Sequence, residues 1–150
     1  MTQRAGNAPD AIATGKDATA RRALQVFIAV AGCLPVFAGA AGIVAGPRFL
    51  GATSPWPVDL DSHMRFLSGV FLVVGLAWWS CIPSIETKGE RLRLLAAMTF
   101  AGGLARLASL GLAGAPSAGH LAGLAMELVA VPFVVLWHAR GVRMGWRRPG

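Results

Sequence analysis

Four apolar runs, each about long enough to cross a bilayer, constrain the fold of this chain more than any other feature. We place these runs at about 22–45, 63–82, 91–113 and 120–140. A helix needs about 20 mostly apolar residues to cross the hydrocarbon core, where only helices and closed barrels satisfy the backbone. Hydrophobic residues make up 55% of the 150 residues and charged residues only 14%, well below the share in soluble domains. The sequence therefore predicts an all-α fold, a four-helix transmembrane bundle.

The segments outside the four runs indicate connections and tails. Residues 1–21 are polar and small, and we expect a disordered cytoplasmic tail there. The longest connection, 46–62, is rich in proline, which suits an irregular lid or a short interfacial helix. Residues 141–150 form a basic cytoplasmic tail. We therefore expect one membrane domain over 22–140, flanked by two tails.

Lysine and arginine flank the runs unequally. Eleven of them lie in the N-terminal tail, the second connection and the C-terminal region, whereas the opposite side has only Arg48 and Arg65. Cytoplasmic loops carry an excess of these residues, so both termini should face the cytoplasm. We expect a multi-pass protein of a prokaryotic cytoplasmic (inner) membrane. Because topology explains the net charge of +7, we expect no nucleic-acid partner.

The third and fourth runs each carry one charged residue well inside. Arg106 lies seven residues before Ala113, where the third run ends, and Glu127 lies seven residues after His120, where the fourth begins. At 1.5 Å per residue, both lie about 10 Å below the outer boundary. A charge in hydrocarbon costs roughly 2.5–3.5 kcal/mol on insertion scales. We therefore expect an Arg106–Glu127 ion pair between two antiparallel helices.

Further polar side chains gather at the expected outer ends of the runs. The second run opens with an aspartate, a histidine and an arginine within five residues, and the fourth opens with a histidine. Together with the intramembrane pair they would line one outward-facing pocket. Its net positive charge would suit a carboxylate, a phosphate or a quinone oxygen. The predicted ligand-binding residues are Arg106, Glu127, Arg65, Asp61, His63 and His120.

Each of these residues also has a purely structural interpretation. The intramembrane pair would be a buried clamp between two helices. Arg65 would extend to the outer headgroups, and Asp61 would cap the helix of the second run. The two histidines, His63 and His120, would be ordinary interfacial residues. No third metal ligand accompanies them in a convincing pattern, so we predict no metal and no cofactor.

Common catalytic signatures are absent from the sequence. It holds no G-x-S-x-G, H-E-x-x-H, phosphate-loop or dinucleotide pattern, so we assign no catalytic residue. We expect a non-enzymatic membrane protein that binds a lipid, a quinone or a small anion, or an accessory membrane subunit. Its partners would be the bilayer, that ligand, and another membrane protein or a second copy. The alternatives are a small membrane isomerase or oxidoreductase subunit using Glu127 for proton transfer, and an oligomeric transporter.

Three segments of the chain resemble a known family. They are DSHMRFLSGVFLVVGL, FAGGLARLASLGLAGAPS and MELVAVPFVVLW. Over about residues 22–140, the chain is similar to the bacterial membrane family called domain of unknown function 4345 (DUF4345), and Arg65, Arg106, Glu127 and Pro132 match the pattern of that family. The resemblance implies the four-span fold and supplies no mechanism. More distantly, the chain resembles DoxX-like four-span proteins, some of which accompany quinone or thiol oxidation.

Overall fold

The described part of the chain is helical throughout its regular structure. A computed structural model describes residues 8–146 in backbone, with side chains from Gly15 onward except that of Lys16. Four helical segments are long and apolar enough to cross a membrane, and no strand occurs within the described residues. These segments are Asp17–Leu50, Val58–Trp79, Gly89–Ala113 and Ala118–Arg143. The all-α prediction with four spans is confirmed.

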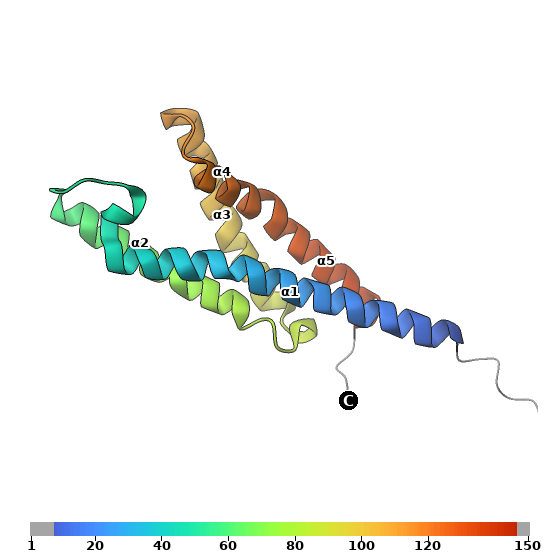
Figure 1. Cartoon of the computed structure of the whole chain (residues 1–150). Coiled ribbons are helices and arrows are strands. Elements are labelled where there is room, and N and C mark those ends of the chain that lie inside the picture. The colour runs from blue at the N-terminus through green and yellow to red at the C-terminus, as the bar shows by residue number, and fades with distance from the viewer. Residues whose placement is uncertain (1–7, 147–150) are drawn as a thin grey trace, which may run out of the picture. The chain divides into compact units, whose positions relative to one another are not determined.

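The helices fall into two compact units, which we describe one at a time (Figure 1). Unit 1 comprises Met1–Gln25 and Ser84–Gly150, and unit 2 comprises Val26–Pro83. Two of the short elements are 3-10 helices, and the third, η3, is a π-helical turn. The elements in chain order are α1 (Ala8–Ala45), η1 (Gly46–Leu50), α2 (Val58–Trp79), η2 (Ile85–Thr87), α3 (Gly89–Ala113), α4 (Ala118–Ala125), η3 (Met126–Ala130) and α5 (Val131–Arg143).

Unit 2 is an antiparallel hairpin in which α1 and α2 pack backbone against backbone (Figure 1). A Cβ atom added at Gly39 would lie 2.5 Å from the backbone nitrogen of Leu72 and 2.7 Å from its Cα. The Trp79 indole covers Gly32 and donates a hydrogen bond to the carbonyl oxygen of Ala29 at 3.0 Å. Small residues permit such close approach between helices in lipid. The hairpin therefore depends on glycine at its crossing.

Unit 1 packs α3 against the continuous rod of α4, η3 and α5, which returns antiparallel to it (Figure 1). Its fully buried side chains include Leu24, Leu92 and Val134. His138 of α5 is also buried, and its Nε2 lies 2.8 Å from the carbonyl oxygen of Ile85 in η2. A polar contact thus joins the connection before α3 to the last helix.

Two helix starts differ by five residues or more from those expected. Helix α1 begins at Ala8, so residues 8–21 are helical where we expected a disordered tail. Alanine-rich sequence favours helix, and an ion pair between Arg21 and Glu86, at 3.3 Å, holds this stretch. Helix α2 begins at Val58, five residues before the expected start, because the segment after Pro57 already suits a first helical turn. The division into one membrane domain and two tails stays a prediction, and residues 1–7 and 147–150 lie outside the described part.

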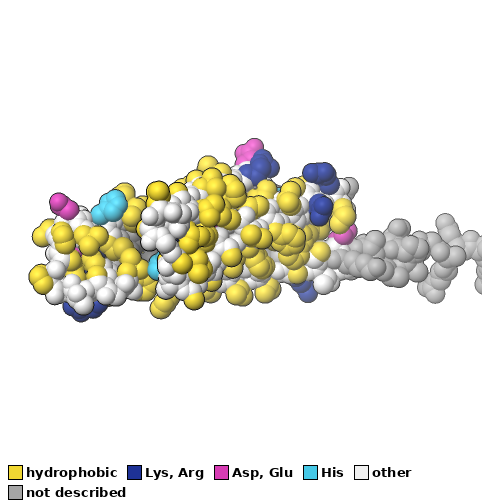
Figure 2. Space-filling view, turned by 90° about the horizontal axis from the view of Figure 1, so that it is seen from above, with side chains coloured by type: hydrophobic (Ala, Val, Ile, Leu, Met, Phe, Trp, Pro, Cys, Tyr) yellow, Lys and Arg dark blue, Asp and Glu magenta, His cyan; other side chains and the backbone are white. Residues whose placement is uncertain are grey.

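Large apolar side chains cover much of the surface. On the face in Figure 2, hydrophobic side chains predominate and charged side chains are confined to a few small groups. Val44 is 81% exposed, Leu112 90% and Val129 70%. A water-soluble monomer rarely exposes so much apolar area, whereas lipid chains cover it without loss. The surface agrees with a membrane-embedded protein.

Candidate functional site

The structure brings together the two charged residues inside the third and fourth spans. Arg106 of α3 donates through Nε to Oε2 of Glu127 at 3.1 Å. The Glu127 side chain is 11% exposed and the Arg106 side chain 34% exposed. The ion pair predicted from equal depths in consecutive antiparallel helices is therefore present.

Glu127 lies on an unusual turn of helix. Residues Met126–Ala130 form the π-helical turn η3, and Pro132 follows as the second residue of α5. A proline there has no N–H to donate to the carbonyl of Leu128, so a regular α-helix would lose a hydrogen bond. A π turn winds the chain more widely, and such turns occur frequently at functional sites. The turn sets the direction in which Glu127 points toward α3.

A glycine on α3 makes room for this turn. A Cβ atom added at Gly103 would lie 2.9 Å from Cβ of Glu127 and 2.8 Å from a methyl carbon of Leu128. Gly103 is three residues before Arg106, so both lie on the same face of α3. The close approach at Gly103 brings the glutamate within reach of the arginine.

Arg106 keeps most of its hydrogen-bonding capacity. A guanidinium group has five N–H donors, and Arg106 uses the one on Nε. Within the described residues, neither of its terminal nitrogens, Nη1 and Nη2, has a hydrogen-bond partner. Donors left unsatisfied in hydrocarbon cost several kcal/mol each, on the order of 2–7 kcal/mol. The arrangement can therefore accept an oxygen from a ligand beside Glu127.

Arg65 of unit 2 has a different environment. Its Nε and Nη2 donate to the two carboxylate oxygens of Asp61 at 2.7 and 3.2 Å. Its Nη1 donates to the carbonyl oxygen of Val44 at 3.2 Å and also to that of Ile43. Asp61 accepts a further hydrogen bond from the Trp56 indole at 3.3 Å. These contacts satisfy the last carbonyl groups of α1, which have no partner inside the helix.

The other predicted site residues lie at helix starts. His63 is an exposed residue of α2. His120 of α4 places its Nδ1 at 2.9 Å from the hydroxyl oxygen of Ser117. The N-cap of α2 is Pro57 and Asp61 is the fourth residue of that helix, so the interpretation of Asp61 as an N-cap is wrong. Its carboxylate instead accepts hydrogen bonds from the Arg65 guanidinium group and the Trp56 indole.

The six predicted residues divide between the two units. Arg106, Glu127 and His120 belong to unit 1, while the three residues of the second span belong to unit 2. A single pocket lined by all six stays a prediction. No group of three or more His, Cys, Asp or Glu side chains in the described residues is placed to hold a metal ion.

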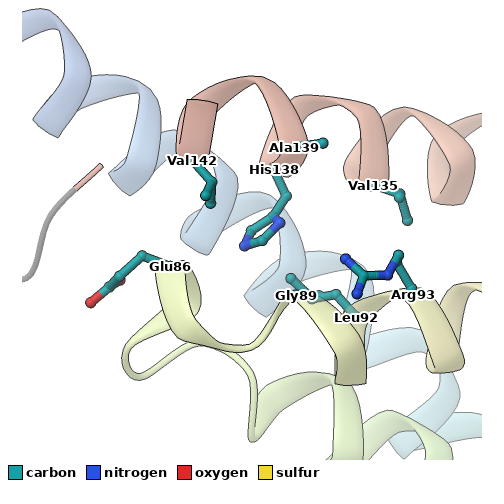
Figure 3. Close-up of a pocket in the computed structure, with 8 residues that line it drawn as sticks. All are labelled: Glu86, Gly89, Leu92, Arg93, Val135, His138, Ala139 and Val142. Carbon is teal, nitrogen blue, oxygen red and sulfur yellow. The ribbon is translucent and has the colours of Figure 1, made fainter. Parts of the chain in front are cut away.

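Sequence reasoning missed a second polar cluster in unit 1. Buried His138 lies beside a pocket between η2, the start of α3 and the end of α5 (Figure 3). A helical pattern could have found it, because Val131, Val134, His138 and Gly141 are the buried residues of α5 and recur on one face. The pocket is lined by Glu86, Gly89, Leu92, Arg93, Val135, His138, Ala139 and Val142.

Four apolar helices with a half-buried ion pair between two of them define a small multi-pass membrane protein. A family model described as Domain of unknown function (DUF4345) matches residues 23–138, so the chain belongs to this family. The resemblance noted from the sequence is thereby confirmed. No curated protein and no solved structure matches the chain, and the distant likeness to DoxX-like proteins has no support from the comparisons.

Proposed function

We propose that this membrane protein binds a membrane-soluble ligand through Arg106, with Glu127 fixing the direction of the guanidinium group. The observation that carries the proposal is the single hydrogen bond between the two side chains, which leaves both terminal nitrogens of Arg106 without a partner in the described residues. The ligand would be a lipid, a quinone or a small anion with an accepting oxygen. The protein would act alone or as an accessory membrane subunit.

The charge at this pair favours an uncharged acceptor. Glu127 already balances the charge of Arg106, so a dianion would bring uncompensated charge into a medium of low dielectric constant. A quinone carbonyl or a lipid ester carbonyl accepts two N–H groups without that penalty. Arg65 would add positive charge, but all three of its guanidinium nitrogens already donate within unit 2. We therefore restrict the proposed site to Arg106 and Glu127.

The position of Arg106 supports a ligand that enters from the lipid. It lies seven residues before the end of α3 at Ala113, or about 10 Å along the helix. The distribution of lysine and arginine favours an inner-membrane protein with both termini in the cytoplasm, which would put Arg106 in the outer half of the bilayer. A ligand with a polar head and an apolar tail fits that depth.

The test is ligand-dependent thermal stability of the full-length protein in detergent. Arg106→Gln, Glu127→Gln and the double variant would be compared with the parent, with and without a quinone bearing a short isoprenoid tail, or a diacyl lipid. A ligand at about 100 times its Kd stabilises by about 2.7 kcal/mol. We expect this gain in the parent and in an Arg140→Gln control, and its loss in Arg106→Gln. Glu127→Gln should weaken it.

A purely structural clamp gives a different pattern. Each single variant would then be destabilised, because an unpaired charge is left behind, and the double variant would largely recover. If neither probe stabilises the parent and the variants follow this pattern, the pair is a clamp and the proposed function is wrong.

A further inference from the structure

Unit 1 holds a second polar cavity, separate from the Arg106–Glu127 pair. Its volume is about 270 Å3, and it lies between η2, the start of α3 and the end of α5 (Figure 3). Arg93, one of its lining residues, is thirteen residues before Arg106 on α3, which corresponds to about 20 Å along the helix. A ligand in this cavity therefore does not touch the ion pair.

The polar wall of the cavity is built around a glycine. The side chains of Arg93, from α3, and His138, from α5, both reach the space beside Gly89 (Figure 3). A Cβ atom added at Gly89 would lie 3.2 Å from Cε1 of His138 and 3.4 Å from Nη1 of Arg93. Gly89 is not among the glycines with positive φ, so its backbone does not require glycine. The missing side chain instead leaves room between Arg93 and His138.

Hydrogen-bond donors converge on this space. Arg93 is an exposed residue, and within the described residues its guanidinium group has no hydrogen-bond or ion-pair partner. His138 already donates through Nε2 to the carbonyl oxygen of Ile85. Helix α3 begins at Gly89 and runs for 25 residues. The first N–H groups of such a helix have no partner inside it and carry the positive end of its dipole. Two independent kinds of donor, the guanidinium group of Arg93 and the N–H groups at the start of α3, therefore face one cavity.

The remaining lining groups make the cavity amphipathic. The carboxylate of Glu86 also borders it, but that side chain is 6% exposed and paired with Arg21 at 3.3 Å, so its charge is balanced. The net charge of the lining is then the positive charge of Arg93. The other wall is apolar and consists of Leu92, Val135, Ala139 and Val142.

We infer that this cavity binds a phosphate group. Arginine meets phosphate through two parallel hydrogen bonds, and helix N-termini bind the same group through backbone N–H donors. The apolar wall gives space for the chain of a lipid whose headgroup carries the phosphate, and a free phosphate ion would use the same donors. The inference stands independently of the proposed function at Arg106.

The test measures phosphate binding by calorimetry on the full-length protein in a maltoside detergent and a phosphate-free buffer. The probes are inorganic phosphate and, separately, dihexanoyl phosphatidylglycerol below its critical micelle concentration. We expect Arg93→Gln to raise the Kd about tenfold, because a charge-assisted pair is lost. Gly89→Ala should raise the Kd about threefold by filling the space, while leaving every charge in place. Arg140→Gln is the matched control, an exposed arginine of α5 outside the cavity lining.

The outcomes separate the two sources of phosphate. Binding of the lipid alone, lost in Arg93→Gln and kept in Arg140→Gln, identifies a headgroup site. Binding of inorganic phosphate with the same pattern identifies a free-phosphate site. If Arg93→Gln does not fold, weaker binding by Gly89→Ala at unchanged thermal stability still supports the inference. Absence of binding by the parent to both probes, or equal weakening in Arg93→Gln and Arg140→Gln, overturns it.

Discussion

Two arginines of this protein each contact a carboxylate, but they use their hydrogen-bond donors very differently. In unit 2, Arg65 donates from all three guanidinium nitrogens, to Asp61 and to carbonyl groups at the end of α1. In unit 1, Arg106 donates to Glu127 from Nε alone. An arginine whose donors are occupied holds the fold together. One that keeps its terminal nitrogens can still bind another molecule.

The two units also differ in the helix geometry around a proline. Helix α1 passes Pro35 without leaving the α-helical state, whereas the π turn η3 stands immediately before Pro132 and its helix. A proline alone therefore does not impose a π turn. In unit 1 the π turn carries Glu127, and π turns occur frequently at functional sites. The difference suggests a packed hairpin in unit 2 and a binding element in unit 1.

The largest expected effect tests the packed hairpin. Gly39→Ala places a methyl group against the backbone of Leu72, and α1 and α2 must separate to accommodate it. Overpacking of this kind costs about 1–3 kcal/mol, and the contact here is with rigid backbone. We expect a clear fall in Tm by differential scanning fluorimetry in detergent. Gly69→Ala is the control, because nothing lies within 4 Å of that position, and it should be neutral or slightly stabilising.

An unchanged Tm for Gly39→Ala would mean that the hairpin is not packed as tightly as the structure has it. The same result would remove the contrast between the packed hairpin of unit 2 and the binding element of unit 1. The comparison of the two arginines would then need other support.

The second effect compares Arg65→Gln with Arg106→Gln in the absence of ligand. Arg65→Gln removes the donors that satisfy the last carbonyl groups of α1 and leaves Asp61 with the Trp56 indole. We expect it to lower Tm more than Arg106→Gln does. The rise in Tm on adding the quinone or lipid probe should show the opposite order. Arg65→Gln should keep this rise, and Arg106→Gln should lose it. Equal losses of stability in the two variants would show that donor use does not separate the two roles.

The spans and the intramembrane pair could be predicted from the sequence because each depends on simple physical limits. The length of an apolar run defines a span. The observed C-terminal ends of α1 at Ala45 and of α3 at Ala113 are the residues expected from the sequence. The Arg106–Glu127 contact follows from the equal depth of the two residues in neighbouring antiparallel helices and from the cost of an unpaired charge in lipid. These arguments need no knowledge of packing detail.

Several of the contacts that the sequence did not indicate have backbone atoms as partners. Arg65 meets the carbonyl groups of Ile43 and Val44, and His138 meets the carbonyl of Ile85. Every residue has a carbonyl oxygen, so no residue type marks the acceptor. The start of α1 at Ala8 could not be predicted either, because a polar helical segment has the same composition as a disordered tail.

The smallest expected effect on stability is that of Pro132→Ala, which tests the π turn itself. An alanine restores an N–H that can bond the carbonyl of Leu128, so the segment can rewind toward a regular α-helix. Rewinding would turn Glu127 away from Arg106 by about 100°, the rotation of one helical residue. We expect Tm without ligand to change little, because a hydrogen bond gained offsets an ion pair lost, while the gain from the quinone or lipid probe falls. Pro35→Ala is the matched control, since α1 is already α-helical there. If Pro132→Ala keeps the full ligand response, the π turn is not needed to aim Glu127, and the binding role would depend on Arg106 alone.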